Sequence, residues 1–353
     1  STSLDLNTLN IGSNTDATNY SKTTINGNVF ANSTVLNNNG TTNSSELILA
    51  SGKNITSTIT TADANMGILT LAGGTQTVTG QVGNGNKLAE VNAGNGTSTF
   101  ANDVYATNLD VEGTGTVNLD GKFTGTAVRY NADGTVILAD TKNIDSSVTT
   151  ATNNTGTLSL EGSSTVTGQV GASGASLKEI NAGVAGTTST FANDVYATNT
   201  NIGSGRVDFN TVSGTTNTNI IFSDNGTANL LNGLTGDIDF AGKDATVNVS
   251  DGKGILGSVQ TLASNNTGII NYQGDGTISG NSINSGASGI KELNINTANQ
   301  QNSGGPGLVI GYTALARELY ADVVNLRNNA TLTLKDNVNL INTGSDNILI
   351  TVD

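Results

Sequence analysis

The sequence predicts an all-β protein, a parallel β-helix in which short strands stack turn upon turn. The first observation behind this prediction is internal repetition: the twelve residues TSTFANDVYATN occur at 97–108 and again, unchanged, at 188–199. The second is the alternation of apolar and polar residues with a period of two, in short segments bounded by Gly, Asn or Asp. Together these features are typical of a solenoid, in which each unit buries its apolar side against its neighbours.

The repetition extends well beyond the identical segment. Three blocks, GILTLAG, TVTGQVG and LAEVNAG at 67–73, 77–83 and 88–94, correspond to GTLSLEG, TVTGQVG and LKEINAG at 156–162, 165–171 and 177–183. A decayed third copy follows residue 267, and a trace of a fourth lies near the start. We therefore expect one β-helix over 1–353, with repeat units of approximately 1–65, 66–154, 155–266 and 267–353.

Individual segments show the strand pattern clearly. In GTLSLEG, Leu158 and Leu160 alternate with polar residues, and ATLTLKDNVNLIN at 330–342 keeps the same period over two strands. Strand-bearing blocks recur roughly every twenty residues, which predicts roughly seventeen or eighteen circuits of a β-helix. The best helix candidate is YTALARELYADVVNL at 312–326, but its alignment with FANDVYATN favours a strand.

The abundant asparagines have two interpretations. Inward Val, Ile and Leu are expected to form aliphatic stacks, and inward Asn residues could form side-chain ladders between turns. The alternative, which we favour for any given Asn, is a turn residue that tolerates left-handed dihedral angles.

Composition excludes several classes of function. The chain has 14 Lys and Arg against 28 Asp and Glu, a net charge of −14, so it lacks the basic patch that nucleic acid or an anionic membrane requires. It has no His and no Cys, which excludes Ser-His-Asp triads, Cys-His dyads and His-based zinc sites. The absence of Cys suits a bacterial surface protein that crosses an oxidising compartment unfolded.

Carboxylate pairs are the remaining catalytic candidates, because β-helices also occur in polysaccharide-cleaving enzymes. The pairs considered are Asp237 with Asp239, in GDIDF, and Asp103 with Asp110. Asp237 and Asp239 are expected on the same face of a strand, whereas glycosidase carboxylates need a controlled separation across a sugar ring. Outward, solvated aspartates explain both pairs better, and we expect no catalytic residues and no enzyme activity.

Three loops place Asp beside Gly, as calcium loops do: NADGT at 131–135, SDNGT at 223–227 and GDGT at 274–277. None matches the twelve-residue calcium loop or a tandem calcium-binding nonapeptide. Turn formation explains them better, and we expect no metal and no cofactor.

The identical segments contain two pairs of aromatic residues, Phe100 with Tyr105 and Phe191 with Tyr196. They could form an exposed stripe for a receptor. A role in the core is the better interpretation, at least for Phe100 and Phe191, because the chain has few aromatic residues to spare from packing. The segment at 296–307, which contains Pro306, is the least strand-like and is our first candidate for a variable contact loop.

No segment reads as a signal peptide or a membrane-spanning helix, and the longest apolar stretch, at 307–316, is far too short to span a bilayer. The strand pattern is already under way at the first residues and still present at the last. We therefore expect the chain to be a fragment of a larger protein.

The blocks GTLSLEGSSTVTGQVG, LKEINAG and STFANDVYATNTNI resemble the repeats of the rickettsial surface cell antigen autotransporters, of the outer-membrane protein A and B type. The resemblance covers at least residues 66–353. It implies a passenger domain that is secreted through a separate C-terminal barrel, displayed on the bacterial surface at the outer membrane, and involved in adhesion to and entry into host cells. Together with the general preference for right-handed parallel crossovers, it also implies a right-handed helix.

Two classes of function follow from these observations. The first is a non-enzymatic adhesin or surface-coat protein, whose partner is an unidentified host-cell surface protein, with no nucleic acid and no direct membrane insertion by this chain. The second is a β-helical enzyme that degrades polysaccharide. Self-association into a surface layer is a variant of the first, in which the partner is another copy of the chain.

Overall fold

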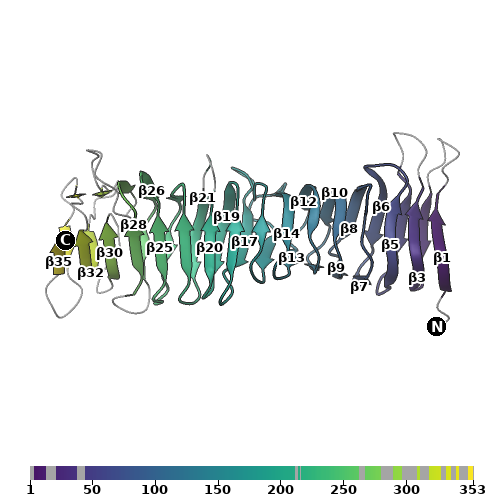
Figure 1. Ribbon diagram of the computed structural model, residues 1–353, viewed down its shortest axis with the longest axis horizontal. Helices are drawn as coiled ribbons and strands as arrows, with labels where there is room; N and C mark the ends of the chain where they lie inside the picture. Colours follow the sequence, from purple (N-terminus) through teal and green to yellow (C-terminus); the bar gives the residue numbers. More distant parts are fainter. Residues whose placement is uncertain are drawn as a thin grey trace. The chain divides into compact units, whose positions relative to one another are not determined.

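The computed structural model describes residues 4–12, 21–37, 44–210, 214, 216–261, 267–279, 289–295, 308–310, 318–326, 331–334, 339–341 and 349–352. Within these residues all regular secondary structure is β, without a helix, and parallel strands stack as a β-solenoid of about 12 turns (Figure 1). The predicted fold class is confirmed. The turns are fewer than expected because many are longer than twenty residues, with inter-turn separations that reach 26 residues in unit 1 and 32 residues in unit 2.

The chain divides into two compact units, Ser1–Glu179 and Ile180–Asp353, here called unit 1 and unit 2. The strands that begin in unit 1 are β1(Leu4–Ile11), β2(Lys22–Ile25), β3(Val29–Leu36), β4(Glu46–Leu49), β5(Ile55–Thr61), β6(Met66–Leu71), β7(Gly74–Val78), β8(Leu88–Ala93), β9(Gly96–Phe100), β10(Val104–Val111), β11(Thr116–Leu119), β12(Phe123–Tyr130), β13(Thr135–Leu138), β14(Asn143–Thr150), β15(Thr157–Leu160), β16(Thr165–Val166) and β17(Leu177–Ala182). Those of unit 2 are β18(Thr188–Phe191), β19(Val195–Ile202), β20(Arg206–Phe209), β21(Thr216–Phe222), β22(Thr227–Leu230), β23(Leu234–Thr235), β24(Ile238–Asp239), β25(Thr246–Val249), β26(Lys253–Leu256), β27(Val259–Gln260), β28(Ile269–Tyr272), β29(Gly276–Ile278), β30(Ile290–Ile295), β31(Leu308–Ile310), β32(Glu318–Leu326), β33(Leu332–Leu334), β34(Asn339–Ile341) and β35(Leu349–Val352).

Each turn of unit 1 passes through three parallel backbone ladders. Ladder 1 runs through Leu4, Val29, Ile55, Val78, Phe100, Leu119, Leu138 and Leu160. Ladder 2 runs through Leu9, Thr34, Ile59, Val82, Val104, Phe123, Ile144 and Val166. Ladder 3 runs through Thr23, Leu47, Leu69, Val91, Leu109, Val128, Val148 and Val170. Each residue thus pairs with its equivalent one turn later, as parallel crossover connections require.

The two copies of the block TVTGQVG do not return to the same ladder. Val78 and Val166 are equivalent in sequence, but Val78 lies in ladder 1 and Val166 in ladder 2. Val82 and its equivalent Val170 are displaced in the same sense, from ladder 2 to ladder 3. The repeat therefore spans four turns plus the step from one ladder to the next. Its two copies present the same outward side chains in different directions.

In unit 2 the register of β18 continues through β20, β22, β25, β28, β30 and β32 to β35. The described part of the helix candidate 312–326 is strand β32, Glu318–Leu326, which pairs with β30 and β35. The preference for a strand over a helix is confirmed for these residues. Tertiary pairing outweighs the helix propensity of Ala, Leu and Glu here.

The core of the solenoid follows from the alternation in each strand. In β15 the side chains of Leu158 and Leu160 are buried while those between them are half-buried, and most four-residue strands repeat this pattern. In unit 2, two pairs of inward rings stack one turn apart: Phe191 on Phe209 at 5.6 Å between centroids, and Phe222 on Phe240 at 5.4 Å. Stacking of equivalent side chains between turns is what a parallel in-register solenoid permits.

Asparagine and aspartate side chains at the corners of the coil link one turn to the next. In each of these contacts the side-chain oxygen accepts a hydrogen bond from a backbone N–H about one turn later in the chain. The acceptors include Asn28, Asn54, Asp103, Asp133, Asp140, Asn143 and Asn153 in unit 1 and Asn219, Asn225, Asp237 and Asp251 in unit 2. The favoured interpretation of Asn as a turn residue therefore holds in part, because these corner residues also satisfy backbone donors of the following turn.

Candidate interaction surfaces

The outward side of β7, β9, β11, β13 and β15 in unit 1 carries a column of threonines. Five of them are register partners of one another: Thr75, Thr97, Thr116, Thr135 and Thr157. A second column, two residues further along each strand, contains Thr77, Thr99, Asn118, Ile137 and Ser159. We call these ten residues the threonine face. None of them is charged, and the hydroxyls of the first column repeat at the strand spacing of about 4.8 Å.

Glycine precedes each threonine of the first column and makes this regular spacing possible. A Cβ atom on Gly96 would lie 2.3 Å from the carbonyl oxygen of Gly74, and one on Gly115 would lie 2.1 Å from that of Gly96. Any other residue would force adjacent turns apart. The recurring Gly-Thr dipeptide is the signal in the sequence that points to this face, which was not among the sites predicted from the sequence.

The hydroxyls of the first threonine column are unused within the described part of the chain. None of these five hydroxyls donates to or accepts from another described residue, whereas Asn118 on the second column donates to the Thr99 hydroxyl at 3.1 Å. Thr75 and Thr97 are exposed and Thr116, Thr135 and Thr157 half-buried. A flat row of uncharged donors and acceptors is therefore available to a partner.

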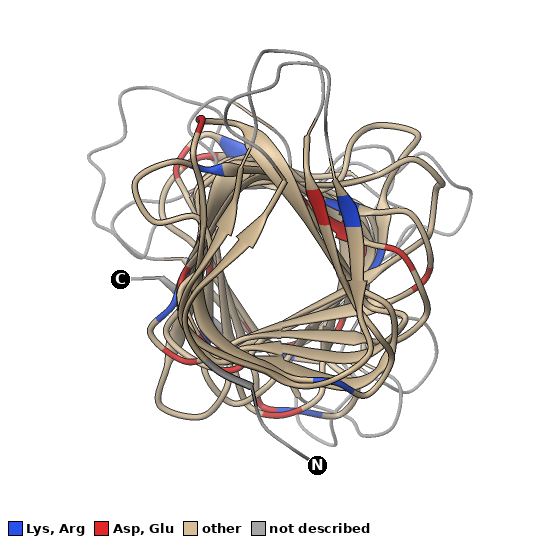
Figure 2. Cartoon of the chain, turned by 90° about the vertical axis from the view of Figure 1, so that its right-hand side faces the viewer, with Lys and Arg blue, Asp and Glu red and all other residues tan. Residues whose placement is uncertain are grey.

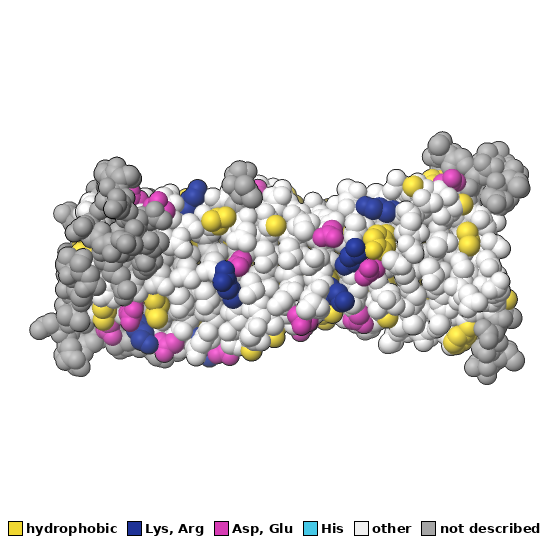
Figure 3. Space-filling model, viewed as in Figure 1, with side chains coloured by type: hydrophobic (Ala, Val, Ile, Leu, Met, Phe, Trp, Pro, Cys, Tyr) yellow, Lys and Arg dark blue, Asp and Glu magenta, His cyan; other side chains and the backbone are white. Residues whose placement is uncertain are grey.

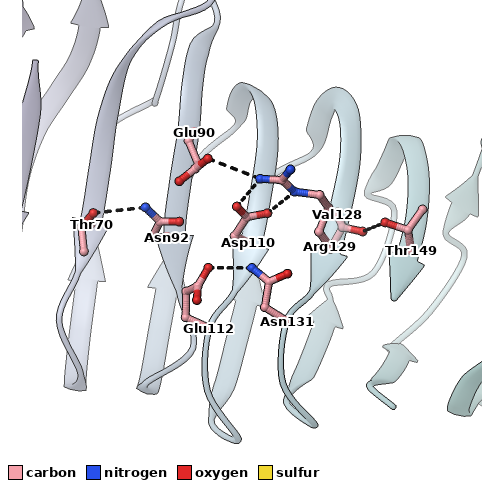
Figure 4. Close-up of polar contacts among 9 residues, drawn as sticks. All are labelled: Thr70, Glu90, Asn92, Asp110, Glu112, Val128, Arg129, Asn131 and Thr149. Atoms are coloured by element: carbon pink, nitrogen blue, oxygen red, sulfur yellow. Dashed lines mark hydrogen bonds and ion pairs between the residues drawn. The ribbon is translucent and has the colours of Figure 1, made fainter. Parts of the chain in front are cut away.

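Ladder 3 of unit 1 carries an ion cluster on its outward side (Figure 4). Arg129 forms a bidentate pair with Asp110, with Nε donating to Oδ1 at 2.5 Å and Nη2 donating to Oδ2. Nη2 also lies 3.3 Å from Oε2 of Glu90. The hydrogen bond to Asp110 raises the pKa of Arg129. Because the Asp110 side chain is only 3% exposed, this pair stabilises the coil and leaves little of the carboxylate for a ligand.

Neighbouring polar side chains of the same ladder are also paired between turns, as Figure 4 shows. Asn92 donates to the hydroxyl of Thr70 at 3.3 Å, and Asn131 donates to Glu112 at 2.7 Å. Figure 3 shows that the visible described surface is mostly free of charged and hydrophobic side chains, and the strands and turns in Figure 2 carry few charged residues. What distinguishes the threonine face from ladder 3 is therefore its unpaired hydroxyls, since ladder 3 uses its polar groups internally.

Unit 2 contains a ladder of asparagine side chains. Each Nδ2 donates to the Oδ1 of the residue one turn earlier, at 2.5 to 2.9 Å, through Asn325, Asn294, Asn271, Asn248 and Asn229 to Asp208. At this end Asp208 also accepts from Nε of Arg206 at 2.6 Å. All amide dipoles of the ladder thus point the same way, with their donor ends toward the carboxylate.

The asparagine ladder corrects one expectation from the sequence. The sequence analysis considered ladders of inward asparagines as the less favoured possibility, but these residues alternate with buried Ala228, Val247 and Ile270 and lie on the outward side of their strands. Inward positions in these strands are aliphatic or aromatic. The amides on the outward side satisfy one another from turn to turn, which offsets the cost of the partial burial that reaches 4% exposure at Asn294.

The two carboxylate pairs considered from the sequence are engaged in hydrogen bonds and an ion pair within the coil. Asp237 and Asp239 flank buried Ile238 on the outward side, as expected, and accept from the backbone N–H of Ser258 and of Ala241. Asp103 lies just before β10 and accepts from the backbone N–H of Lys122, whereas Asp110 lies within β10 and is held by Arg129. The aspartates of both pairs therefore serve as acceptors in contacts that hold the coil together.

The calcium-like loops have their aspartates occupied in other ways. Asp133 accepts from the N–H of Gly156 and pairs with Lys178 at 2.8 Å. Asp224 accepts from the N–H of Asn225, and in the third loop the backbone N–H of Asp275 donates to the carboxylate of Asp251, one turn earlier. Among the residues that the structure describes, no group of three or more acidic side chains is placed to hold a metal ion.

The aromatic residues of the identical segments separate by type. Phe100 and Phe191 are fully buried, which confirms the core interpretation for both. Tyr105 and Tyr196 are half-buried. Tyr105 donates to Asp103 at 3.3 Å, and the Lys122 ammonium lies 5.1 Å from the centre of its ring. The hydrogen bond with Tyr105 raises the pKa of Lys122.

The contact loop proposed at 296–307, including Pro306, lies outside the described residues. In the part of the chain that is described, no helix has the length and hydropathy needed to cross a membrane. No protein-family model, curated protein or solved structure matches the chain.

Proposed function

We propose that this chain is part of a surface-exposed, non-enzymatic adhesin or coat protein, the passenger of a bacterial autotransporter, that attaches the bacterium to host cells and supports entry. The observation that carries the proposal is the threonine face. Its ten uncharged residues lie in register from turn to turn, and the five threonines of the first column have unpaired hydroxyls within the described part of the chain. Such a surface offers many weak polar contacts along its length and no reactive group. Its function is therefore binding, and its partner is a host-cell surface protein.

The architecture also supports secretion in an extended form. Each turn of a solenoid packs mainly on its neighbours. Folding can therefore begin in the turns that leave a narrow channel first and propagate to the turns that follow. The chain contains no Cys that could be trapped as a disulfide in an oxidising compartment. Brief protease treatment of intact bacteria that express the protein should remove it, whereas protection of the protein until the cells are lysed would contradict surface display.

The adhesive role is tested with beads that carry the purified protein and are applied to cultured host cells. The triple variant Thr97→Val, Thr116→Val and Thr135→Val removes three unpaired hydroxyls but keeps β-branched side chains of the same shape. Adhesion should fall severalfold because the face loses hydrogen bonds to its partner. The matched control is Thr227→Val with Thr246→Val, two register-paired, half-buried threonines of unit 2.

Equal adhesion by wild type, the triple variant and the control would remove the threonine face from the proposal. A parallel screen for release of reducing sugars from acidic and neutral polysaccharides tests the enzymatic alternative. Turnover that survives the triple variant but disappears in Asp237→Asn or Asp239→Asn would replace the adhesin proposal with a glycan-cleaving enzyme.

A further inference from the structure

Asparagine is followed directly by glycine six times in the chain. These pairs begin at Asn26, Asn39, Asn84, Asn95, Asn225 and Asn232. In such a pair the backbone nitrogen of the glycine can attack the side-chain carbonyl carbon of the asparagine, because glycine has no Cβ to hinder the approach and adopts the required backbone angles freely. The attack also needs a glycine nitrogen that is free to move. Five of the six pairs, all except the one at 39–40, lie within the described residues and can be compared on this point.

The pair Asn84-Gly85 lies in the loop between β7 and β8 and is open to solvent. Both residues are exposed, Gly85 has a φ of 86°, and a Cβ atom added to it would meet nothing within 4 Å. Within the described part of the chain, neither the Gly85 N–H nor the Asn84 side chain makes a hydrogen bond. The next residue anchors the loop instead: Nδ2 of Asn86 donates to the carbonyl oxygens of Thr61 and Ala62 at 3.3 and 3.0 Å. The reacting groups are therefore free while the loop around them is held.

The pair Asn26-Gly27, between β2 and β3, has the same properties. Both residues are exposed, and neither the Gly27 N–H nor the Asn26 side chain is bonded to another described residue. A Cβ atom on Gly27 would again meet nothing within 4 Å, and its φ lies outside the left-handed range. An alanine would therefore fit here without strain. We call these two pairs the open sites.

The other three described pairs have their glycines fixed by the coil. Gly226 is buried, and its N–H donates to the carbonyl oxygen of Asp224 at 2.9 Å. Gly233 is also buried, and an added Cβ atom would lie 2.4 Å from a backbone carbonyl oxygen of the next turn. Gly96 belongs to β9 and is in register with β7 one turn earlier. We call these three pairs the held sites, because their nitrogens cannot approach the asparagine side chain without loss of native contacts.

We propose that Asn26 and Asn84 are sites of spontaneous deamidation in the folded protein, with water as the co-reactant. The glycine nitrogen loses its proton and bonds to Cγ of the asparagine. The bond from Cγ to Nδ2 then breaks, so that the amide leaves as ammonia with that proton and a cyclic succinimide remains. Water opens the ring at one of its two carbonyl carbons and gives aspartate or isoaspartate. Each event replaces a neutral amide with a carboxylate and makes the net charge of −14 more negative.

The solenoid accommodates both products. Neither asparagine side chain is packed in the core, and the glycine that follows each one has open space around it. The extra backbone methylene of isoaspartate therefore stays within an exposed loop. The melting temperature of the deamidated protein should equal that of fresh protein, so the modification accumulates on native molecules.

The test incubates the purified chain at body temperature in mildly alkaline buffer and follows every Asn-Gly pair by peptide mass spectrometry. Digestion in water labelled with heavy oxygen separates amides lost during incubation from those lost during digestion. We expect both open sites to lose their amides at least about tenfold faster than the held sites, because a held glycine must first be released by local opening. Under strong denaturation in urea the open sites should lose this lead.

Gly27→Ala is the matched variant, because alanine fits at this position. It should slow the reaction at Asn26 severalfold and leave the rate at Asn84 unchanged. Asn84→Gln should abolish the reaction at position 84 and leave Asn26 unaffected, since the longer side chain does not close the same ring readily. Similar native rates at open and held sites would overturn the proposal. A lead of the open sites that persists unchanged in urea would also overturn it, because local sequence and not the fold would then set the rates.

Discussion

The ring of Tyr130 lies directly against Gly156: a Cβ atom added to Gly156 would come 2.5 Å from Cγ of the tyrosine ring. Gly156 also has a φ of 87°, a left-handed conformation. The Tyr130 side chain is almost fully buried, and its hydroxyl donates to the carbonyl oxygen of Thr157 at 2.6 Å. Burial raises the pKa of Tyr130, so the hydroxyl remains a donor. Glycine is therefore required both for the turn and for the ring.

Gly156→Ala should lower the free energy of unfolding by about 2–4 kcal/mol, the sum of a left-handed alanine and overpacking against Tyr130. The matched control is Gly174→Ala. Gly174 has a similar φ of 79° but nothing within 4 Å of its added Cβ, so only the conformational cost of about 1 kcal/mol applies. Urea denaturation measures both, and equal losses in the two variants would contradict the packing argument.

Arg129→Met should destabilise the protein by about 2–3 kcal/mol, because it leaves the carboxylate of Asp110 buried without its partner. This loss of stability is smaller than for a fully buried ion pair because the Arg129 side chain is 38% exposed. Adding Asp110→Asn to Arg129→Met should recover most of the loss, since the uncompensated charge is gone. A double-mutant cycle by urea denaturation measures the coupling, and purely additive effects would show that the pair contributes nothing specific.

Asn248→Thr should cost about twice as much stability as Asn325→Thr. Among the described side chains, Asn248 makes two ladder bonds, to Asn229 and from Asn271, whereas Asn325 makes one, to Asn294. With about 1 kcal/mol for each bond, losses of about 2 and 1 kcal/mol are expected, and polarisation along the ladder enlarges the difference. Amide hydrogen exchange in β22, β25 and β28 reports the local effect. Equal protection in both variants would contradict a continuous ladder.

The ion pair of Asp133 and Lys178 should give a defined pH dependence. The hydrogen bond from Lys178 lowers the pKa of Asp133, and the bond to Asp133 raises the pKa of Lys178. The contribution of Asp133 is therefore present above its unfolded pKa of about 3.9 and lost as the pH falls. The contribution of Lys178 is present below its unfolded pKa of about 10.4 and lost as the pH rises.

The measurement is the melting temperature of wild type and Lys178→Met as a function of pH. The wild type should be slightly more stable across the neutral range. The difference should vanish in acid as the pH falls through the lowered pKa of Asp133, and in alkali as the pH rises through the raised pKa of Lys178. Lys142→Met is the control, because Lys142 has no ion pair within the described residues. A pH-independent difference between wild type and Lys178→Met would indicate packing of the lysine stem instead of its charge.

Much of the fold could be predicted from local pattern. Alternation in segments such as GTLSLEG indicated which residues face inward, and Leu158, Leu160, Phe100 and Phe191 are buried as expected. The identical segments indicated stacking. These features were accessible because a parallel solenoid repeats the same local environment in each turn, so the burial of one residue predicts that of its copies.

The surfaces were harder to predict. Asp110 and Arg129 are 19 residues apart and were not linked, because their pairing depends on the length of one particular turn. Turn lengths in unit 1 range from 18 to 26 residues, so contact partners cannot be read from a fixed period. The threonine face was missed for a different reason: its Gly-Thr dipeptides stand at intervals that change with the turns, and only the register shows that the threonines coincide.

By itself, the sequence determined that this protein is a stack of short parallel strands with an aliphatic and aromatic core, because period-two alternation and repetition are properties of the chain alone. Only the tertiary structure decided which outward side chains meet. Val78 and Val166 have the same neighbours in sequence but lie on different ladders, because the repeat is longer than four turns by the step from one ladder to the next. The accumulated length of the turns, which is a sum over many loops, determines the direction in which each copy points.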